Sequence, residues 1–415
     1  MKLKTNRYFI ILLPLIGFLL SCSHPSQNNV HTLDTDFQSV MNTICCSPEF
    51  KDNEQHDFTG LDFRVGAYFW YGFSYNGPHL TDRLYKEFAD RKPVWGWIDS
   101  SLVNMEQQIE YAAAGGLTYF AFDWYYNCMP QMDRAVNTFL RAGNSSKMQF
   151  CLLVANEEGA YIPYDKWEDA CNQWMPYLTN KQALKVDGKP VIFFFSAYHL
   201  VSELGGTDKT KECINYLDNR VKEAGLPGVM VVGCENPYGS GPAREIDYNP
   251  DAFNEQEWID LLKERESQGL SGLSGYNYRK YSPVPQGNTT TYQLSYKEMT
   301  SEHEKCWEAF SKYNSIPYVP VILGGWDCRP WETSTYGGGS RSCYAPDRTP
   351  RQLYDHILNA AEWMKENPNY SFGNLAVIYA FNEYCEGGYI APTMGDRGLL
   401  LNAVRQAVQK IKNQK

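Results

Sequence analysis

Eight short apolar runs, each followed by a stretch with helical spacing, constrain the fold of this chain more than any other feature. The runs are rich in β-branched and aromatic residues and stay hydrophobic at successive positions, which is typical of parallel strands buried on both faces. Eight strand-then-helix units predict a closed parallel (β/α)8 barrel, the TIM-barrel fold. The runs cover residues 64–71, 118–124, 149–155, 190–196, 229–234, 273–278, 318–323 and 375–381.

Helical segments alternate with these runs to the end of the chain without a linker, so we expect residues 61–415 to form one domain. The sixth run is the weakest, because residues 269–275 have little apolar content. An open doubly wound sheet would show a similar rhythm, but no glycine-rich phosphate loop follows the first run. The helices are predicted at residues 105–114, 133–142, 166–177, 209–224, 254–268, 296–313, 349–366 and 397–412.

The first residues of the chain have the pattern of an export signal. Basic residues precede an almost unbroken apolar stretch, Tyr8–Leu20, which is too short to span a membrane. Cys22 follows at the position where a bacterial lipoprotein lipobox has its lipidated cysteine. We expect residues 1–21 to be a lipoprotein signal peptide and residues 22–60 to be an irregular tether, anchored through Cys22 to a membrane of the cell envelope. A plain signal peptide with an incidental cysteine is the alternative.

The charge balance limits the partners of the mature chain. Removal of Lys2, Lys4 and Arg7 with the signal leaves 38 − 3 = 35 basic residues against 48 acidic ones, a net charge of 35 − 48 = −13. An acidic chain with no basic block argues against nucleic acid as a partner and fits a neutral substrate. The histidines and cysteines show no metal-ligand spacing, so we expect neither a metal nor a cofactor. A monomer is expected.

Polar and aromatic residues stand at the carboxyl ends of the predicted strands, which is where TIM barrels place their active sites. Aromatic rings can stack on sugar faces, and carboxylates and amides can bond sugar hydroxyls. The strand ends therefore predict a rim that binds an oligo- or polysaccharide, although strands also end in polar residues simply because they leave the core. The expected substrate-binding residues are Trp70, Tyr71, Asp123, Trp124, Asn156, Glu157, Glu235, Tyr278, Trp326, Asp327 and Asn382.

The sharpest local pattern is Asn382-Glu383-Tyr384-Cys385-Glu386-Gly387, directly after the eighth run. Hydrolysis of a glycosidic bond uses two carboxyl groups, one that protonates the leaving oxygen and one that acts as base or nucleophile. If the chain turns helically here, Glu383 and Glu386 lie close enough for their charges to raise one pKa. Both are expected to be catalytic. The alternative is that the two glutamates are an ordinary surface pair. The position of the motif directly after a buried strand argues against that alternative.

This motif, with Tyr389-Ile390-Ala391-Pro392 after it, resembles the closing motif of glycoside hydrolase family 99 and the related WbsX-like proteins. Ala155-Asn156-Glu157 and Val186–Pro190 resemble further family segments. The resemblance implies a retaining endo-α-mannosidase on a (β/α)8 barrel. It implies that Glu383 is the base that activates the sugar 2-hydroxyl, that Glu386 is the general acid and base, and that Asn382 holds the sugar or orients Glu383. Tyr384-Cys385 departs from the Trp-His of those hydrolases.

Three alternatives remain open from the sequence. Glu383 could work with Glu235 or Glu157 across the barrel mouth, because other barrel glycosidases place their two carboxylates on separate strands. The chain could be a non-catalytic glycan-binding lipoprotein, which would keep the aromatic rim. It could also be a WbsX-like glycosyltransferase, although the sequence shows no nucleotide-sugar site of the D-x-D type with basic neighbours.

Overall fold

The computed structural model describes residues 28–51, 55–74, 79–127, 134–157, 159–239, 247–280, 292–313, 316–331 and 343–414. The chain divides into two compact units, Met1–Ser39 and Val40–Lys415. The second unit holds every element of the barrel. Within the described part of the chain, no helix is both long and apolar enough to cross a membrane. Cys22 and the predicted signal peptide lie outside the described residues.

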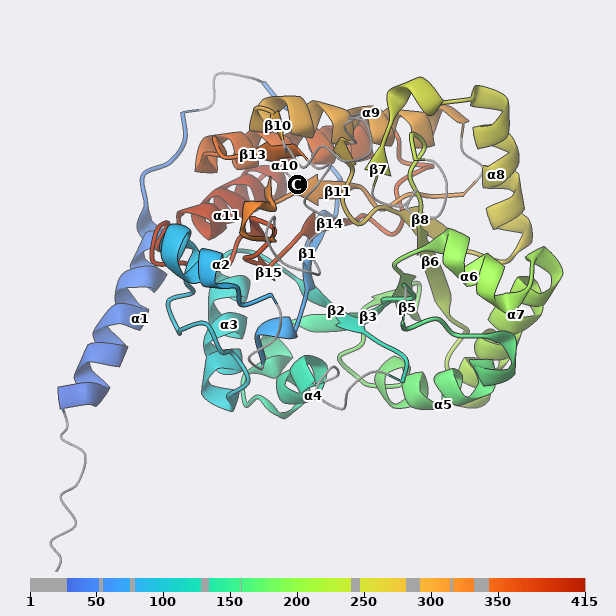
Figure 1. The fold of residues 1–415 in the computed structure, drawn as a ribbon, viewed down its shortest axis with the longest axis horizontal. Helices are drawn as coiled ribbons and strands as arrows, with labels where there is room; N and C mark the ends of the chain where they lie inside the picture. Colours follow the sequence, from blue (N-terminus) through green and yellow to red (C-terminus); the bar gives the residue numbers. More distant parts are fainter. Residues whose placement is uncertain are drawn as a thin grey trace, which may run out of the picture. The chain divides into compact units, whose positions relative to one another are not determined.

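The second unit is a (β/α)8 barrel, as the sequence predicted (Figure 1). Neighbouring strands are parallel, in the order β11-β14-β1-β2-β3-β5-β6-β8. A parallel bridge between Leu273 and Tyr318 joins the last strand of that order to the segment before the first, through two backbone hydrogen bonds of 2.8 Å. The weak sixth run is therefore a barrel strand. The strands are β1 (Arg64–Phe69), β2 (Tyr119–Trp124), β3 (Gln149–Val154), β5 (Lys189–Phe194), β6 (Met230–Cys234), β8 (Gly272–Ser274), β11 (Val321–Leu323) and β14 (Leu375–Tyr379).

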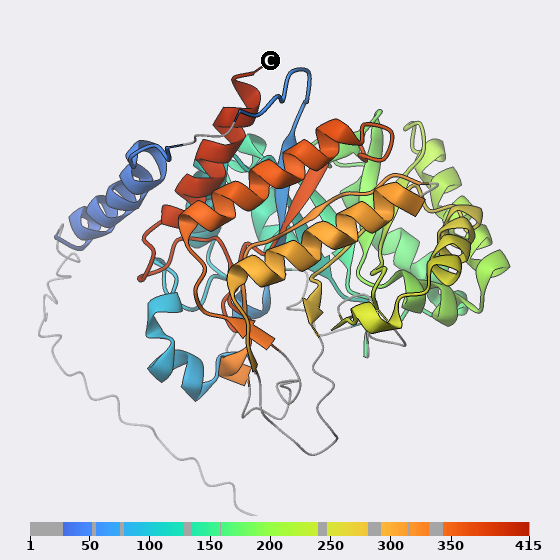
Figure 2. The same cartoon turned by 90° about the horizontal axis from the view of Figure 1, so that it is seen from above.

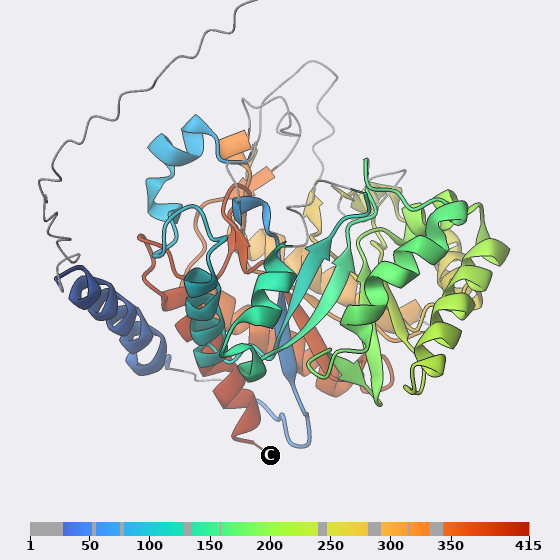
Figure 3. The same cartoon turned by 90° about the horizontal axis from the view of Figure 1, so that it is seen from below.

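Eight helices at the predicted places surround these strands. Figure 2 shows α9, α10 and α11 side by side on one flank of the barrel, and Figure 3 shows the flank that carries α3, α4 and α5. The start of α10 is fixed by a capping box between Thr349 and Gln352, with Pro350 in the first turn. The helices are α3 (Leu102–Ala114), α4 (Arg134–Arg141), α5 (Trp167–Leu178), α7 (Thr207–Glu223), α8 (Glu255–Ser267), α9 (Tyr296–Tyr313), α10 (Pro350–Glu366) and α11 (Leu399–Lys412).

Three further helices were not predicted. The expectation of an irregular tether is wrong for α1 (Asn28–Cys46), in which Val40 and Ile44 are one helical turn apart and both buried. The others are α2 (Asp82–Glu87) and α6 (Ala197–Leu204). Short strands complete the fold: β4 (Lys185–Val186), β7 (Asp247–Tyr248), β9 (Arg279–Lys280), β10 (Tyr292–Gln293), β12 (Trp326–Asp327), β13 (Cys343–Ala345), β15 (Asn382–Glu383) and β16 (Gly388–Tyr389).

The alternation of side chains along β2 decides which residues face the interior of the barrel. Phe122 packs against Phe139 of α4 with ring centroids 5.4 Å apart, and Trp124 packs against Trp174 of α5 at 5.6 Å. Both side chains therefore point outward, toward the helices. Asp123 lies between them in an extended strand, so its carboxyl group points inward at the carboxyl end of the barrel.

Candidate active site

The glutamate motif forms a tight antiparallel hairpin, so the helical turn considered from the sequence is not what the chain adopts. Strands β15 and β16 pair with Glu383 opposite Gly388, and Gly387 has a φ of 70° in the turn. Gly388 lies against the ring of Tyr379, where an added Cβ would be 2.4 Å from Cε1. The hairpin packs on the last barrel strand, which places Glu383 and Glu386 at the carboxyl end of the barrel.

Four carboxyl groups come within electrostatic reach of one another at this end of the barrel; we call them the mouth carboxyls. They are Asp123, Glu157, Glu383 and Glu386. Burial raises the pKa of Glu383 well above its usual range, and the charges of Glu386 and Asp123 raise it further. Burial also raises the pKa of Glu386. The two glutamates lie in one hairpin, and the charge of Glu386 raises the pKa of Glu383, so the two carboxyls do not lose their protons at the same pH.

The other two mouth carboxyls differ in their access to solvent. Asp123 is 5% exposed, and burial, followed by the charges of Glu157 and Glu386, raises its pKa well above the usual range. Glu157 follows β3 and keeps contact with solvent. The surrounding protein and the charge of Glu386 still raise the pKa of Glu157 to about 7. The sequence placed all four residues at the site, and the structure brings them together.

Two tyrosines that the sequence analysis did not select bond the glutamate pair. The hydroxyl of Tyr276 donates to Oε1 of Glu383 at 3.2 Å, and the hydroxyl of Tyr379 donates to Oε2 of Glu386. The rings of the two tyrosines are 4.9 Å apart, and Tyr276 also packs on Tyr68 at 5.1 Å. These rings form the floor beneath the carboxyl groups. Tyr379 lies inside an apolar strand, and nothing local in the sequence distinguishes it from a core residue.

Two carboxyl oxygens at the site are buried and accept no hydrogen bond from the described residues. They are Oε2 of Glu383 and Oδ1 of Asp123. Buried polar atoms are nearly always hydrogen-bonded, so an oxygen without a partner in a concave site indicates a place where a ligand can donate a hydrogen bond. Glu383 thus has one oxygen held by Tyr276 and one available to a ligand.

Aromatic residues stand beside the mouth carboxyls. The indole nitrogen of Trp70 donates to the hydroxyl of Tyr125 at 3.2 Å. The Tyr71 and Tyr125 rings are 6.0 Å apart. Burial raises the pKa of Tyr125 most, and the charges of Asp123, Glu157 and Glu383 raise it further. Trp326 lies 6.2 Å from Tyr379, ring to ring, and carries the guanidinium of Arg279 at 5.0 Å from its centroid. Tyr125 and Arg279 were not among the expected site residues.

Other expected substrate-binding residues bond the protein itself. Both ends of the Asn382 amide bond the backbone of Trp70, which ties the hairpin to β1. The Asn156 amide bonds the backbone nitrogen and oxygen of Ser196 in the same way. Trp124 points outward to α5, as described above. Asn382 and Asn156 thus hold neighbouring segments together at the mouth. For Asn382 this agrees with one of its two expected roles, the orientation of Glu383.

Two expected carboxylates are paired with arginines. Glu235 is fully buried, and its Oε2 accepts from Nε of Arg265 at 2.7 Å. Tyr278 lies next to this pair, and its hydroxyl bonds Tyr318 at 2.8 Å. Because Glu235 belongs to a buried ion pair in the wall, the alternative that Glu383 works with Glu235 is not supported. Asp327 has two arginine partners, which hold its pKa below the usual range despite burial.

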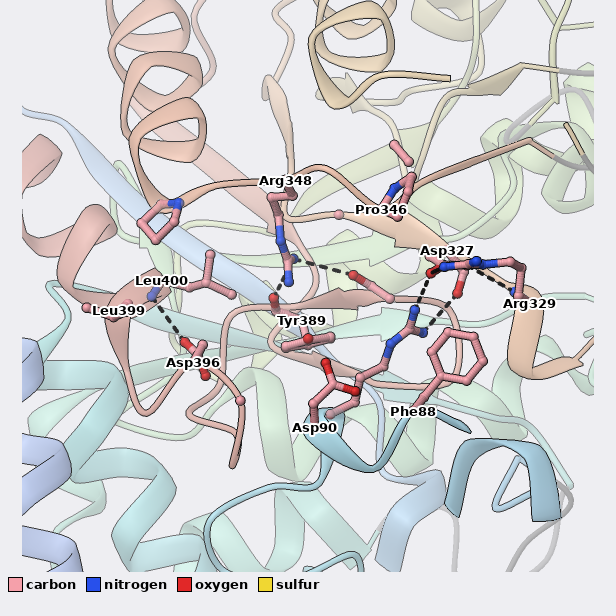
Figure 4. Close-up of a pocket in the computed structure, with 16 residues that line it drawn as sticks. Phe88, Asp90, Asp327, Arg329, Pro346, Arg348, Tyr389, Asp396, Leu399 and Leu400 are labelled. Atoms are coloured by element: carbon pink, nitrogen blue, oxygen red, sulfur yellow. Dashed lines mark hydrogen bonds and ion pairs between the residues drawn. The ribbon is translucent and has the colours of Figure 1, made fainter. Parts of the chain in front are cut away.

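Two arginines, the buried Arg91 and the half-buried Arg348, donate hydrogen bonds to the glutamate hairpin. Arg91 donates to Oδ2 of Asp327 and to the backbone oxygen of Tyr384 within the motif. Arg348 donates to the backbone oxygens of Gly387 and Tyr389 at 3.4 and 2.8 Å. Figure 4 shows Arg348 beside Tyr389, and Arg329 beside Asp327, around a cavity of about 540 Å³. Gly387 and Asp327 line this cavity and the mouth carboxyls do not, so it lies beside the candidate site.

Among the described residues, no group of three or more histidine, cysteine, aspartate or glutamate side chains is arranged to hold a metal ion.

The fold and the site define a TIM-barrel protein with a cluster of carboxyl groups at the carboxyl ends of its strands. The chain belongs to the family described as glycosyltransferase WbsX, whose sequence model matches residues 97–404. No curated protein matches the sequence. The family resemblance that the glutamate motif predicted is confirmed.

Solved structures share this fold at low sequence identity. The GH99 endo-alpha-mannosidase from Bacteroides thetaiotaomicron is 12% identical with a TM-score of 0.54, and the match covers 85% of this chain and 99% of that one. A structure of this endo-alpha-mannosidase in complex with BIS-TRIS-Propane gives the same values. A glycoside hydrolase-like protein is 13% identical with a TM-score of 0.52, over 90% of this chain and 98% of that one. At such identities the likeness establishes the fold.

Proposed function

We propose that this protein is a glycoside hydrolase that cleaves an α-linked glycan with retention, using Glu383 and Glu386. The single observation that carries the proposal is the glutamate pair at the barrel mouth, with raised pKa values and a tyrosine on each carboxyl. Such a pair can supply an acid and a base at the same pH, which glycoside hydrolysis needs. The GH99 structural neighbours and the closing motif support the α-mannosidase-like chemistry.

The proposed roles follow the family resemblance. Without a ligand the charge of Glu386 raises the pKa of Glu383, so these roles require that the bound sugar reverses that order. Oε2 of Glu383 accepts no bond from the described residues, so it can take the proton of a sugar 2-hydroxyl as that oxygen attacks C1. Glu386, half-buried and bonded by Tyr379, gives its proton to the leaving oxygen as the C1–oxygen bond breaks. Water then opens the resulting three-membered ring at C1, Glu386 takes the water proton and Glu383 returns its own.

A pair of amide variants tests the proposal. Glu386→Gln and Glu383→Gln should each lower turnover by roughly 10³-fold or more, because each removes a proton-transfer group, while glycan binding persists. The assay is release of reducing ends from a panel of α-linked oligosaccharides, with product anomers followed by NMR. Glu168→Gln, an exposed carboxylate on α5, is the control. Unchanged turnover in Glu386→Gln, or inverted product, would contradict the proposal.

The family description favours a second candidate, a glycosyltransferase. It predicts saturable binding of a nucleotide sugar and transfer to an acceptor glycan. A glycan-binding protein without activity predicts oligosaccharide binding that survives loss of either glutamate, with no product from any glycan. Calorimetric titration with nucleotide sugars, run beside the hydrolysis panel, separates these three functions.

We further propose that the protein is lipid-anchored in the cell envelope through Cys22, because Cys22 ends an apolar export signal. The full-length protein should partition into the membrane fraction and incorporate labelled palmitate. Cys22→Ser should abolish the label and release the protein. Labelling of the serine variant would contradict the anchor.

A further inference from the structure

The mouth contains more carboxyl groups than hydrolysis requires. Two carboxyls suffice for acid and base work, and Glu383 and Glu386 supply them. Asp123 and Glu157 are additional. Asp123 points inward from the end of β2, is 5% exposed, and has an oxygen, Oδ1, that accepts no hydrogen bond from the described residues. Neither this oxygen nor Oε2 of Glu383 accepts a hydrogen bond from the described residues, so each can accept one from a ligand.

The charged neighbours that act on Asp123 and Glu383 are themselves acids, whereas the cation Arg279 acts on Glu386. Glu157 and Glu386 act on Asp123, and Glu386, Asp123 and Glu157 act on Glu383. Packing like charges together in a buried site is unfavourable. A neutral sugar hydroxyl can be bonded by a carboxylate, or by an asparagine or glutamine amide without that repulsion. A ligand that brings a positive charge also offsets the repulsion, which a neutral hydroxyl cannot do.

We propose that the sugar bound beside Asp123 carries a free, positively charged amino group, so that the substrate class is a glycan that contains a de-N-acetylated amino sugar. An ammonium group has three N–H donors and no acceptor, which matches acceptor oxygens on Asp123 and Glu383 and offsets the mutual repulsion of the mouth carboxyls. An N-acetyl group would remove the charge and add bulk. This inference rests on the proposed function and names the substrate of the same site.

The experiment measures binding of amino sugars in matched pairs. Glucosamine, mannosamine and galactosamine are each titrated into the full chain by calorimetry at pH 7, beside their N-acetyl derivatives and the parent hexoses. At least one amino sugar should bind about tenfold tighter than its N-acetyl counterpart, because charge-assisted hydrogen bonds replace neutral ones. Asp123→Asn keeps the shape of the side chain and one acceptor oxygen but removes the negative charge, and it should reduce this ratio to about one.

Two further variants keep the result interpretable. Glu157→Gln alters a solvent-accessible mouth carboxyl and should lower the ratio by a smaller factor even if Asp123→Asn fails to fold. Glu168→Gln removes an exposed carboxylate from α5 and should leave the ratio unchanged. Equal affinity for the amino sugars and their neutral partners would overturn the inference, and so would a preference that survives in both mouth variants.

The outcome separates this inference from the proposed function. Hydrolysis of neutral glycans that depends on Glu386, without any preference for amines, would overturn the substrate class and leave the hydrolase standing. Amine binding that depends on Asp123, with no glycan hydrolysed, would overturn the hydrolase and leave the binding preference standing.

Discussion

Carboxyl groups are buried in two regions of this barrel, and their neighbours differ. In the wall, Glu235 and Asp327 each contact at least one arginine at hydrogen-bonding distance. At the mouth, the charged groups that act on Asp123 and Glu383 are other carboxyls. Arginine pairing satisfies a buried charge and makes it part of the scaffold. In the proposed function, the mouth carboxyls serve chemistry and binding at some expense of stability.

The largest effect should come from breaking a wall pair. Glu235→Ala leaves the Arg265 guanidinium buried without its carboxylate and should lower the free energy of unfolding by about 3–5 kcal/mol. Glu383→Gln removes a carboxyl from the repelling cluster and should leave the free energy of unfolding unchanged or slightly raised. Urea denaturation followed by fluorescence measures both. Equal destabilisation in the two variants would remove the distinction between wall and mouth.

A second variant tests whether the hairpin geometry positions the mouth glutamates. Gly388→Ala places a Cβ 2.4 Å from the Tyr379 ring, so the hairpin must shift. A displacement near 1 Å at catalytic groups can cost about 10²-fold in rate, and we expect turnover to fall by roughly that factor. Gly143→Ala is the matched control, because the nearest atom to its added Cβ is 3.5 Å away. Normal turnover in Gly388→Ala would show that the hairpin tolerates movement.

Replacing Tyr379, which donates a hydrogen bond to Glu386, tests the role of the mouth carboxyls through the pH dependence of turnover. The hydroxyl of Tyr379 lowers the pKa of Glu386, so Tyr379→Phe should raise that pKa. The limb of the pH–rate profile on which Glu386 loses its proton should move to higher pH by about one unit. Tyr276→Phe should instead affect the limb that belongs to Glu383. Superimposable profiles for wild type and Tyr379→Phe would exclude this hydrogen bond from catalysis.

The smallest effect concerns stability against pH. The pKa of Glu157 rises from 4.5 to about 7 on folding, so its contribution to stability is present below pH 4.5 and is lost as pH rises through 7. Glu157→Gln should therefore gain stability relative to wild type over this window, by about one to a few degrees in melting temperature. Asp327, whose pKa is lowered, contributes with the opposite sign. A constant difference between variant and wild type would contradict the raised pKa.

The sequence alone determined the barrel and the position of its active end. Eight buried strands and the helices after them are recorded locally, as runs of apolar residues and their spacing, so their order and number could be predicted. The mouth carboxyls were also found from the sequence, because residues that follow parallel strands meet at one end of the barrel. The closing motif also predicted the family to which the chain belongs.

Only the tertiary structure decided which strand-end residues face a ligand. Glu235 and Asp123 both end an apolar strand, yet Glu235 meets Arg265 on α8, whereas Asp123 points to other acids. Tyr379 and Glu386 meet because a hairpin folds back on the last strand. A side chain's partner depends on which distant segments pack together, and hydrophobic periodicity records only which face is buried.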